Sequence, residues 1–421
     1  MTSAAAPVSA GPRWASIAVP GSTPAPPRSY VLAALAVGPS VLTGVLDSRD
    51  TTLMRTALSS FGVTFTDLSD GVVQVTPPLQ FRPASVQVGL AGTLMRFLPP
   101  LAALATGPSR FEGDAEATAR PVAPLLRGLT QAGAQIEHPE SLPFVVHGHG
   151  SLPGGAVTID ASGSSQFVSG LLLAGARFEH GLDLRHVGGT LPSRPHIELT
   201  VSMLRERGVE VTSARGQNRW IVAPGAISAK DEAIEPDLIN AATFLAAPLI
   251  RGGSVSTPWP THTAQAADAI LAVLTALGAD VVVRDGLVTV SGSGRVRGAH
   301  LHLSLTSEPT CVAAGPLALA DRPGSIRGVG HVRGHETDRL AALEAELKAL
   351  GGLVEQTSDG LAITPAPLHG GTFHTYSDHR MAHAGALIGL AVAGVELDDV
   401  SCTTKTLPDF PGLWRQLLSP L

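Results

Sequence analysis

The chain repeats one pattern of apolar and polar positions six times along its length. In each copy, an Ala/Leu-rich stretch with helical periodicity ends at a glycine, and a short run rich in β-branched residues follows. The turn glycines are Gly38, Gly107, Gly181, Gly253, Gly324 and Gly394, at spacings of 69, 74, 72, 71 and 70 residues. Such even spacing over the whole chain favours internal duplication over a chance alignment of apolar runs.

Each copy also contains a second helical stretch and further strands. In the fourth copy, residues 261–279 have the periodicity of an amphipathic helix. Residues 280–292 then form two alternating runs joined at Asp285-Gly286, the sequence of a tight hairpin. A unit of about 70 residues with two helices and several strands can form a layered helix-on-sheet fold. We therefore expect an α/β (α+β) protein of six repeats, assembled as two lobes of three.

The polar, helix-poor stretch 223–237 lies close to the midpoint of the chain. It predicts the crossover between the two lobes. Because ligands commonly bind between domains, we expect the ligand site in the cleft between these lobes.

Composition excludes several classes of protein. Of the 421 residues, 44% are hydrophobic and 15% charged, so extended disorder is excluded. A net charge of −6 without basic blocks argues against nucleic-acid binding. The two cysteines, Cys311 and Cys402, neither form a disulfide framework nor have metal-ligand spacing. Because the start lacks an apolar signal region and no uncharged apolar run reaches 18 residues, we expect a cytoplasmic protein without a membrane segment.

Positive charge is carried almost entirely by arginine, because lysine occurs only at Lys230, Lys348 and Lys405. A lysine kept in the polar stretch 403–408 indicates that a compact ammonium is needed there. A solvated surface lysine is the alternative interpretation of Lys405.

Polar residues gather where helices are expected to begin. Ser162, Ser164, Ser165 and Gln166 precede the apolar helix 167–175, and such a helix start can bind an anion. Plain N-capping is the alternative, but one serine would satisfy it. Arginines lie at further helix starts, namely Arg96, Arg120, Arg339 and Arg380. For the 333–339 segment, a salt-bridged helix cap is the alternative. Together these positions favour one or two ligands with several negative charges.

His379 and His383 are four residues apart and could share a helix face, as zinc ligands do. No HExxH pattern or third ligand accompanies them. We therefore predict no metal site, and the sequence assigns no role to His383.

Six stretches resemble a known family in order and spacing. They are GLAGTLMRF, the SSQF run, LPSRPHIELT, RGHETDRL, YSDHRMA and TTKTLPDF. In these stretches the chain is similar, from end to end, to 3-phosphoshikimate 1-carboxyvinyltransferase, the family of enolpyruvylshikimate-phosphate (EPSP) synthases. The resemblance implies two lobes of three βαβαββ units, an inside-out α/β barrel-like fold with helix N-termini facing the cleft. It assigns residues 21–229 to the shikimate-phosphate lobe, and residues 1–20 with 230–421 to the phosphoenolpyruvate (PEP) lobe.

The resemblance also implies a reaction and a set of residues. The enolpyruvyl group of PEP moves to the 5-hydroxyl of shikimate 3-phosphate, without metal or other cofactor, in a monomer. The expected PEP-binding residues are Gly92, Arg120, Gln166, Arg339, Arg380 and Lys405. The expected shikimate-phosphate-binding residues are Ser22, Arg28, Ser164, Ser165, Gln166, Ser193, Glu308 and His335. Glu336 is expected to handle the methylene proton and Glu308 the 5-hydroxyl proton, with Thr23 as the third catalytic position.

One segment departs from the family pattern. The family has Gly-Ser-Lys-Ser-x-Ser-Asn-Arg after its first strand, whereas this chain has Thr23 at the lysine and prolines at 24, 26 and 27. A threonine donates a hydrogen bond but carries no charge, and prolines remove backbone N–H donors. Three hypotheses stay open: the family reaction, a diverged enzyme acting on another cyclitol or shikimate-type substrate, and a non-catalytic paralogue that binds metabolites or a partner.

Overall fold

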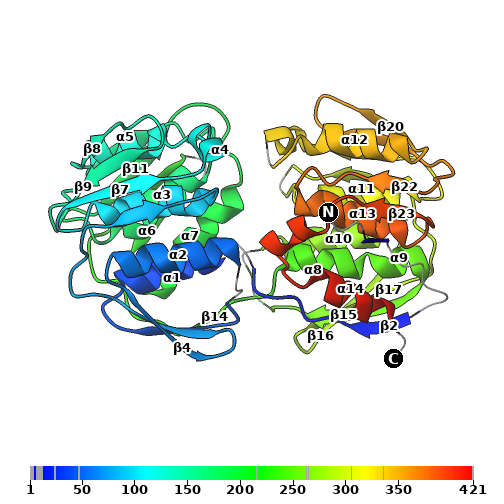
Figure 1. The fold of residues 1–421 in the computed structure, drawn as a ribbon, viewed down its shortest axis with the longest axis horizontal. Helices are drawn as coiled ribbons and strands as arrows, with labels where there is room; N and C mark the ends of the chain where they lie inside the picture. Colours follow the sequence, from blue (N-terminus) through cyan, green and yellow to red (C-terminus); the bar gives the residue numbers. More distant parts are fainter. Residues whose placement is uncertain are drawn as a thin grey trace. The chain divides into compact units, whose positions relative to one another are not determined.

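The computed structural model describes residues 4–5, 13–22, 25–45, 48–214, 217–261, 263, 265–304, 306–334 and 336–419. The chain divides into two compact units, one of Gly21–Glu235 and one of Met1–Pro20 with Pro236–Leu421 (Figure 1). The second boundary thus falls between Glu235 and Pro236, within the polar stretch 223–237.

The described part of the Gly21–Glu235 unit contains three four-stranded sheets, one for each repeat. The first comprises β14 (Glu232–Ala233), β3 (Ser40–Thr43), β5 (Val72–Thr76) and β4 (Thr64–Ser69). The second comprises β6 (Ser85–Gln87), β7 (Pro108–Glu112), β9 (Phe144–His147) and β8 (Gln135–Glu137). The third comprises β10 (Gly155–Ile159), β11 (Leu182–His186), β13 (Arg219–Val222) and β12 (Val211–Ala214). The helices are α1 (Ala25–Leu35), α2 (Arg49–Ser60), α3 (Gly92–Ala102), α4 (Ala115–Thr118), α5 (Ala123–Gln131), α6 (Gln166–Gly175) and α7 (Arg194–Glu206).

The other unit repeats this plan. Its first sheet comprises β2 (Arg13–Ser16), β15 (Gly253–Pro258), β17 (Leu287–Gly292) and β16 (Asp280–Arg284). The second comprises β18 (His300–His302), β19 (Gly324–Arg327), β21 (Leu361–Thr364) and β20 (Leu353–Gln356). The third comprises, in its described part, β22 (Gly371–Phe373), β23 (Val395–Leu397) and β1 (Ala4–Ala5). Its α-helices are α8 (Leu238–Leu245), α9 (Ala247–Arg251), α10 (Ala267–Ala276), α11 (Thr310–Ala318), α12 (Arg339–Ala349), α13 (His379–Gly389) and α14 (Phe410–Leu418). Two 3₁₀ turns are η1 (Gly330–Gly334) and η2 (Ser401–Lys405).

Every four-stranded sheet has the same pairing. Its first two strands are parallel, as in β6 with β7, and the other two pair antiparallel as a hairpin that joins the second strand, as β9 does. Where the parallel strands follow each other in the sequence, as β6 and β7 do, a helix lies between them in the chain, in this case α3. The repeated order of elements confirms the predicted α/β class and the six-repeat fold.

Two repeats obtain their first strand from a distant part of the chain. β14, just before the crossover, pairs in parallel with β3 of the first repeat. β2, near the N-terminus, pairs in parallel with β15 of the fourth repeat. Each unit is therefore completed by a segment that lies outside its continuous run of repeats.

The helices that carry the candidate residues lie in the interior of their units. Phe167–Gly175 of α6 and all of α13 are buried, including the polar His379, Arg380 and His383 of α13. Close helix packing depends on glycine here, because a Cβ at Gly170 would lie 2.2 Å from the Arg96 carbonyl oxygen of α3. The starts of α3 and α6 are thereby held together.

The fourth repeat contains the predicted hairpin. Asp285 and Gly286 have φ values of 51° and 74°, the left-handed pair that a tight Asp-Gly turn requires. The helix predicted from residue 261 begins only at Ala267. Among the helices in the described ranges, none combines the length and the apolar character needed to cross a lipid bilayer.

Candidate active-site residues

Two arginines lie beside the start of α3. Arg96 donates from Nη1 to the Gly92 carbonyl (3.2 Å) and to Oε1 of Gln166 (3.1 Å), and from Nη2 to the Pro121 carbonyl (2.8 Å). Arg120 donates from Nη1 to the Leu90 carbonyl at 2.7 Å. Burial lowers the pKa of Arg96 to about 9, and the neighbouring charge of Arg120 adds to this effect. Two like charges are thus held together by neutral oxygens.

The position of Gly92 shows how close the two guanidinium groups come. A Cβ built on Gly92 would lie 2.5 Å from Nη1 of Arg96 and 2.7 Å from Nη2 of Arg120. Within the described ranges, neither arginine forms an ion pair with a carboxylate. A bound anion at the start of α3 would supply the missing negative charge.

Arg28 is fully buried in α1. Its Nε donates to Oγ1 of Thr200 (2.8 Å), and its Nη2 donates to Oγ of Ser169 (3.5 Å) and to the His196 carbonyl (3.3 Å). The guanidinium also lies over the Phe97 ring, 5.0 Å from its centroid. Burial lowers its pKa to about 10.

Serines border two helix starts in the same unit. Oγ of Ser164 accepts from the Gln166 backbone N–H at 3.2 Å, while the buried Ser165 is the N-cap of α6 and makes no side-chain capping bond. Ser193, the N-cap of α7, has a left-handed φ of 47° and likewise makes no capping bond. In the serine run that precedes α6, the N-cap Ser165 makes no side-chain capping bond and Ser164 accepts one backbone N–H, so capping accounts for one serine of the run.

In the other unit, Glu336 joins two positively polarised groups. Its carboxylate accepts from Nδ1 of His379 (3.1 Å) and from Nζ of Lys405 in η2. Burial alone would raise the pKa of Glu336, but the hydrogen bonds and charges of His379 and Lys405 outweigh it and hold that pKa well below its usual range. Glu336 is therefore an ionised carboxylate at neutral pH.

Arg339 and Asp378 form a buried, two-pronged ion pair. Nε and Nη2 of Arg339 donate to the two oxygens of Asp378 at 2.7 and 3.1 Å, with side-chain exposures of 6% and 0%. Asp378 also caps α13 by accepting from the Arg380 N–H at 2.8 Å. One carboxylate thus orients the arginine that opens α12 and the helix that carries Arg380.

Arg380 is buried beside Asn240, whose Oδ1 accepts from Nη1 at 2.9 Å. Burial lowers the pKa of Arg380, while the charges of Asp237, Glu308 and Glu336 act in the opposite direction. Glu308, in the turn before α11, is thereby placed in the electrostatic surroundings of Arg380. The counter-charge expected for this arginine comes from carboxylates at a distance.

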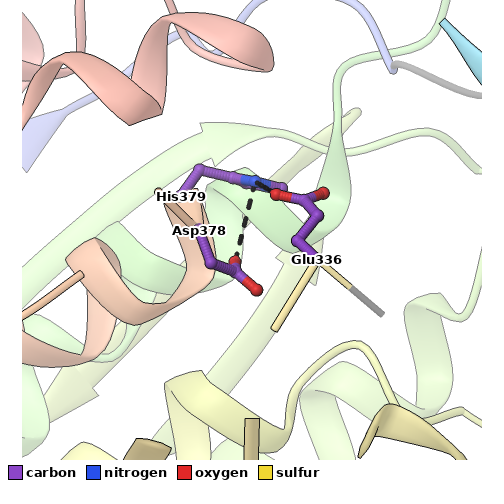
Figure 2. Close-up of side chains that lie close together, drawn as sticks. All are labelled: Glu336, Asp378 and His379. Carbon is purple, nitrogen blue, oxygen red and sulfur yellow. Dashed lines mark hydrogen bonds and ion pairs between the residues drawn. The ribbon is translucent and has the colours of Figure 1, made fainter. Parts of the chain in front are cut away.

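Glu336, Asp378 and His379 offer ligand atoms that all lie within 4.8 Å of one another (Figure 2). Their oxygen atoms already accept from His379, Lys405, Arg339 and the Arg380 backbone N–H. Because a divalent cation would have to displace the cationic side chains of Lys405 and Arg339, we assign no metal to this cluster.

His383 does not form a ligand pair with His379. Its Nδ1 shares a hydrogen bond with Oγ1 of Thr243 at 3.2 Å, and its buried Nε2 has no partner among the described residues. Its ring packs on Phe410, with 4.9 Å between the ring centroids.

The structure brings most of the sequence-predicted residues into two clusters. Gly92, Arg120, Gln166, Ser164 and Ser165 lie around the starts of α3 and α6, with Arg28 at Ser169 of α6. Glu336, Arg339, Arg380, Lys405 and Glu308 lie around the starts of α12 and α13. Ser22 is buried, and its N–H donates to the Glu235 carbonyl at 2.6 Å. Thr23 and His335 lie outside the described residues.

Sequence reasoning missed residues that orient the arginines. Asn240 accepts from Arg380, and Thr200 accepts from Arg28 across 172 positions. A polar Asn inside the apolar run Leu238–Leu245 was a usable signal, because such a group needs a partner when buried. Nothing in the sequence links Thr200 to Arg28.

Fold and clusters together define a duplicated α/β protein with arginines gathered at the starts of its helices. Residues 11–414 match the family model for EPSP synthase (3-phosphoshikimate 1-carboxyvinyltransferase). A curated 3-phosphoshikimate 1-carboxyvinyltransferase from Kocuria rhizophila is 50% identical over 415 residues, which cover 96% of this chain and 93% of that protein.

Solved structures agree with the fold. Two structures of EPSP synthase from Acinetobacter baumannii superpose with TM-scores of 0.83 and 0.82, at 23% and 22% identity. Each alignment covers 99% of this chain, and 97% and 98% of the respective neighbours. The chain belongs to the EPSP synthase family, which confirms the resemblance, and it is therefore an enzyme of the transferase class.

Proposed function

We propose that this chain transfers the enolpyruvyl group of phosphoenolpyruvate to the 5-hydroxyl of shikimate 3-phosphate, giving EPSP and phosphate. The 5-oxygen forms a bond to C2 of PEP and gives up its proton, while C3 gains one. The tetrahedral intermediate then loses a proton from C3 as the C2–O bond to phosphate breaks. Neither step requires an oxidant or a metal.

Both substrates are polyanions, and we assign their charged groups to the arginine clusters. The residues assigned to PEP are Gly92, Arg120, Gln166, Arg339, Arg380 and Lys405. Ser22, Arg28, Ser164, Ser165, Gln166 and Ser193 bind shikimate 3-phosphate, together with Glu308 and His335. The support is electrostatic, because guanidinium groups recognise phosphate and carboxylate in two-pronged fashion.

Two carboxylates are assigned to proton transfer. Glu336 is ionised and hydrogen-bonded to Lys405 and His379, so it is assigned to accept the proton that C3 loses when the intermediate releases phosphate. Glu308 is assigned to the 5-hydroxyl proton, supported by its place in the turn before α11 beside the charge of Arg380.

The observation that carries the proposal is the pair Arg96 and Arg120, two adjacent guanidinium groups without a carboxylate in the described ranges. The test is release of inorganic phosphate from PEP plus shikimate 3-phosphate. We expect Arg120→Gln to lower kcat/KM by about a hundredfold. Arg127→Gln, which removes an exposed ion pair with Glu140, is the matched control and is expected to leave the rate unchanged.

A second candidate is transfer to, or elimination from, another cyclitol or shikimate-type substrate. It is favoured by Thr23 and the prolines that follow, which replace the charged segment of the family pattern. If the purified chain releases no phosphate from shikimate 3-phosphate and PEP, while Thr23→Lys does, transfer to shikimate 3-phosphate is rejected. The result would then favour a different cyclitol or shikimate-type substrate.

We further propose a cytoplasmic monomer with small molecules as its only partners. Substrates of this kind diffuse freely in the cytosol, and each unit has a hydrophobic core of its own. Analytical ultracentrifugation with and without both substrates tests the monomeric state.

A further inference from the structure

The segment before α13 has an unusual backbone. Tyr376 and Ser377 both have φ of 55°, in the left-handed region that ordinary residues seldom occupy. Asp378, His379 and Arg380 follow at once. Two consecutive strained residues persist only where their surroundings hold them, and such strain is typical of functional sites.

Helix α12 holds this segment at two points. At its start, Arg339 binds Asp378. Seven residues further, Glu346 accepts the Tyr376 hydroxyl at 2.6 Å and the His374 backbone N–H at 2.8 Å. Seven residues are about two turns, or about 10 Å along the helix, so Arg339 and Glu346 lie on the same face.

A second carboxylate holds the segment from the opposite end. Asp398, just after β23, accepts from the Thr375 N–H and hydroxyl, both at 2.9 Å, and from Nδ1 of His374 at 3.0 Å. Hydrogen bonds to Glu346 and Asp398 therefore fix the backbone of His374 and Thr375. The left-handed residues Tyr376 and Ser377 follow, and the Tyr376 hydroxyl holds them through its bond to Glu346.

Stability alone does not explain a buried carboxylate at Glu346. Its side chain is only 3% exposed, and no described lysine or arginine forms an ion pair with it. A buried carboxylate without a cation contributes little to stability compared with an apolar residue of similar size. Tyr376, by contrast, is 43% exposed, so its hydroxyl is not needed to complete the core.

The hydrogen bond between them is a strong one. Because the Glu346 carboxylate accepts from the Tyr376 hydroxyl, the pKa of Tyr376 rises to about 12, with burial as the second cause. The Tyr376 hydroxyl therefore keeps its proton throughout the pH range in which enzymes are assayed.

We propose that Glu346 and Tyr376 are positioning residues for the PEP-binding arginines. Their hydrogen bond fixes the left-handed pair, which sets the place of Asp378. Asp378 in turn orients Arg339 and begins the helix that carries Arg380. The proposal rests on the proposed function for the identity of the anion, and it adds two residues that touch no substrate.

The decisive variant is Tyr376→Phe, which removes one hydroxyl oxygen and leaves the ring. We expect KM for PEP to rise about tenfold, with KM for shikimate 3-phosphate unchanged and kcat reduced less than threefold, as a hydrogen bond to a charged group predicts. The thermal midpoint should stay close to that of the wild type, because the ring is half-exposed.

Variants of the carboxylate test the same bond from the other side. Glu346→Gln keeps one oxygen acceptor and should fall between the wild type and Glu346→Ala in KM for PEP. Glu344→Gln is the matched control, because Glu344 lies on the same helix but pairs with Lys348 at its surface. It should leave both KM values unchanged. If Glu346→Ala does not fold, Tyr376→Phe still decides the question.

Calorimetric titration of PEP into the protein without shikimate 3-phosphate separates the two proposals, because binding is then measured without turnover. If the wild type binds PEP and Tyr376→Phe binds it equally well, the positioning role is overturned. The same holds if both KM values rise together, since that is the mark of a purely structural defect. If the wild type binds no PEP, the proposed function fails, and the positioning proposal fails with it.

Discussion

Gly92 shows how one missing methyl group can decide an anion site. Its α-carbon lies so near Arg96 and Arg120 that a Cβ would be 2.5 and 2.7 Å from their nitrogens. We expect Gly92→Ala to displace at least one guanidinium group and to raise KM for PEP by about ten- to hundredfold. The free energy of unfolding should fall by about 1–3 kcal/mol, because the buried Arg96 guanidinium must move away from its hydrogen-bond partners. Steady-state kinetics with PEP varied measure the effect.

Gly225→Ala is the control for this prediction, since a Cβ at Gly225 meets no atom within 4 Å. It should leave KM unchanged. Equal kinetics for both variants would show that the guanidinium groups move aside without loss of binding.

The buried His383 makes the free energy of unfolding depend on pH. Burial, followed by the charge of Arg380, lowers the pKa of His383 well below its usual value. The unfolded chain therefore takes up a proton below about pH 6.5 that the folded chain refuses, so stability falls as pH decreases through that range. We expect His383→Leu to reduce this acid-side slope of the unfolding free energy by up to about 1.4 kcal/mol per pH unit. Urea unfolding at pH 5 to 8 measures it.

His383 is not the only buried histidine that contributes to this pH dependence. His379 has its pKa lowered by burial too, so a residual slope should survive the substitution. Parallel curves for wild type and His383→Leu would mean that another group carries the acid dependence.

At the scale of helices, α12 and α13 both begin with an aspartate N-cap that pairs with an arginine, and the two caps differ in burial. Asp338 caps α12 and pairs with Arg333 at 3.1 Å, with side-chain exposures of 39% and 32%. Asp378 caps α13 and pairs with Arg339, almost fully buried. We expect Asp378→Asn to destabilise by about 3–5 kcal/mol, because asparagine still caps but leaves a buried guanidinium without its charge partner.

Asp338→Asn removes the same charge from the same kind of cap at a half-exposed place. It should cost less than about 1 kcal/mol. Chemical denaturation of both variants gives the comparison, and similar losses would contradict the role of burial.

Local sequence signals predicted the helices and turns more successfully than they predicted the contacts between them. The Asp285-Gly286 turn, the helix after the serine run and the helix after Asp378 all follow from short-range preferences that the structure confirms. The start of α10 was predicted at residue 261 but lies at Ala267, because local signals define the type of an element better than its ends.

The site could be predicted only in part. Its arginines stand out as charges at the starts of apolar helices. Their neutral partners do not, because Asn240 and Arg380 are 140 positions apart, and Glu346 and Tyr376 are 30 apart. Such contacts depend on helix packing, which periodicity does not specify.

At the scale of the whole molecule, the unit that contains Pro236–Leu421 depends on a strand from the opposite end of the chain. β2 pairs with β15 over four residues, and the N–H of Ile17 continues the ladder to the Ser256 carbonyl at 2.9 Å. Ile17 and Val19 are buried in the core of the second unit. Burying two such side chains contributes about 3–6 kcal/mol, so the N-terminal segment is a large part of that unit's stability.

This arrangement predicts different behaviour for the two halves of the chain. A fragment of residues 21–235 contains all strands of its three sheets, including β14, and should unfold cooperatively in urea. A fragment of residues 236–421 lacks β2, so its unfolding midpoint should be low or its transition broad. Adding a peptide of residues 1–20 should restore a sharp transition, because the peptide supplies the parallel strand and the two buried side chains. Circular dichroism measures both transitions, and a fragment 236–421 that is equally stable without the peptide would show that β2 is dispensable.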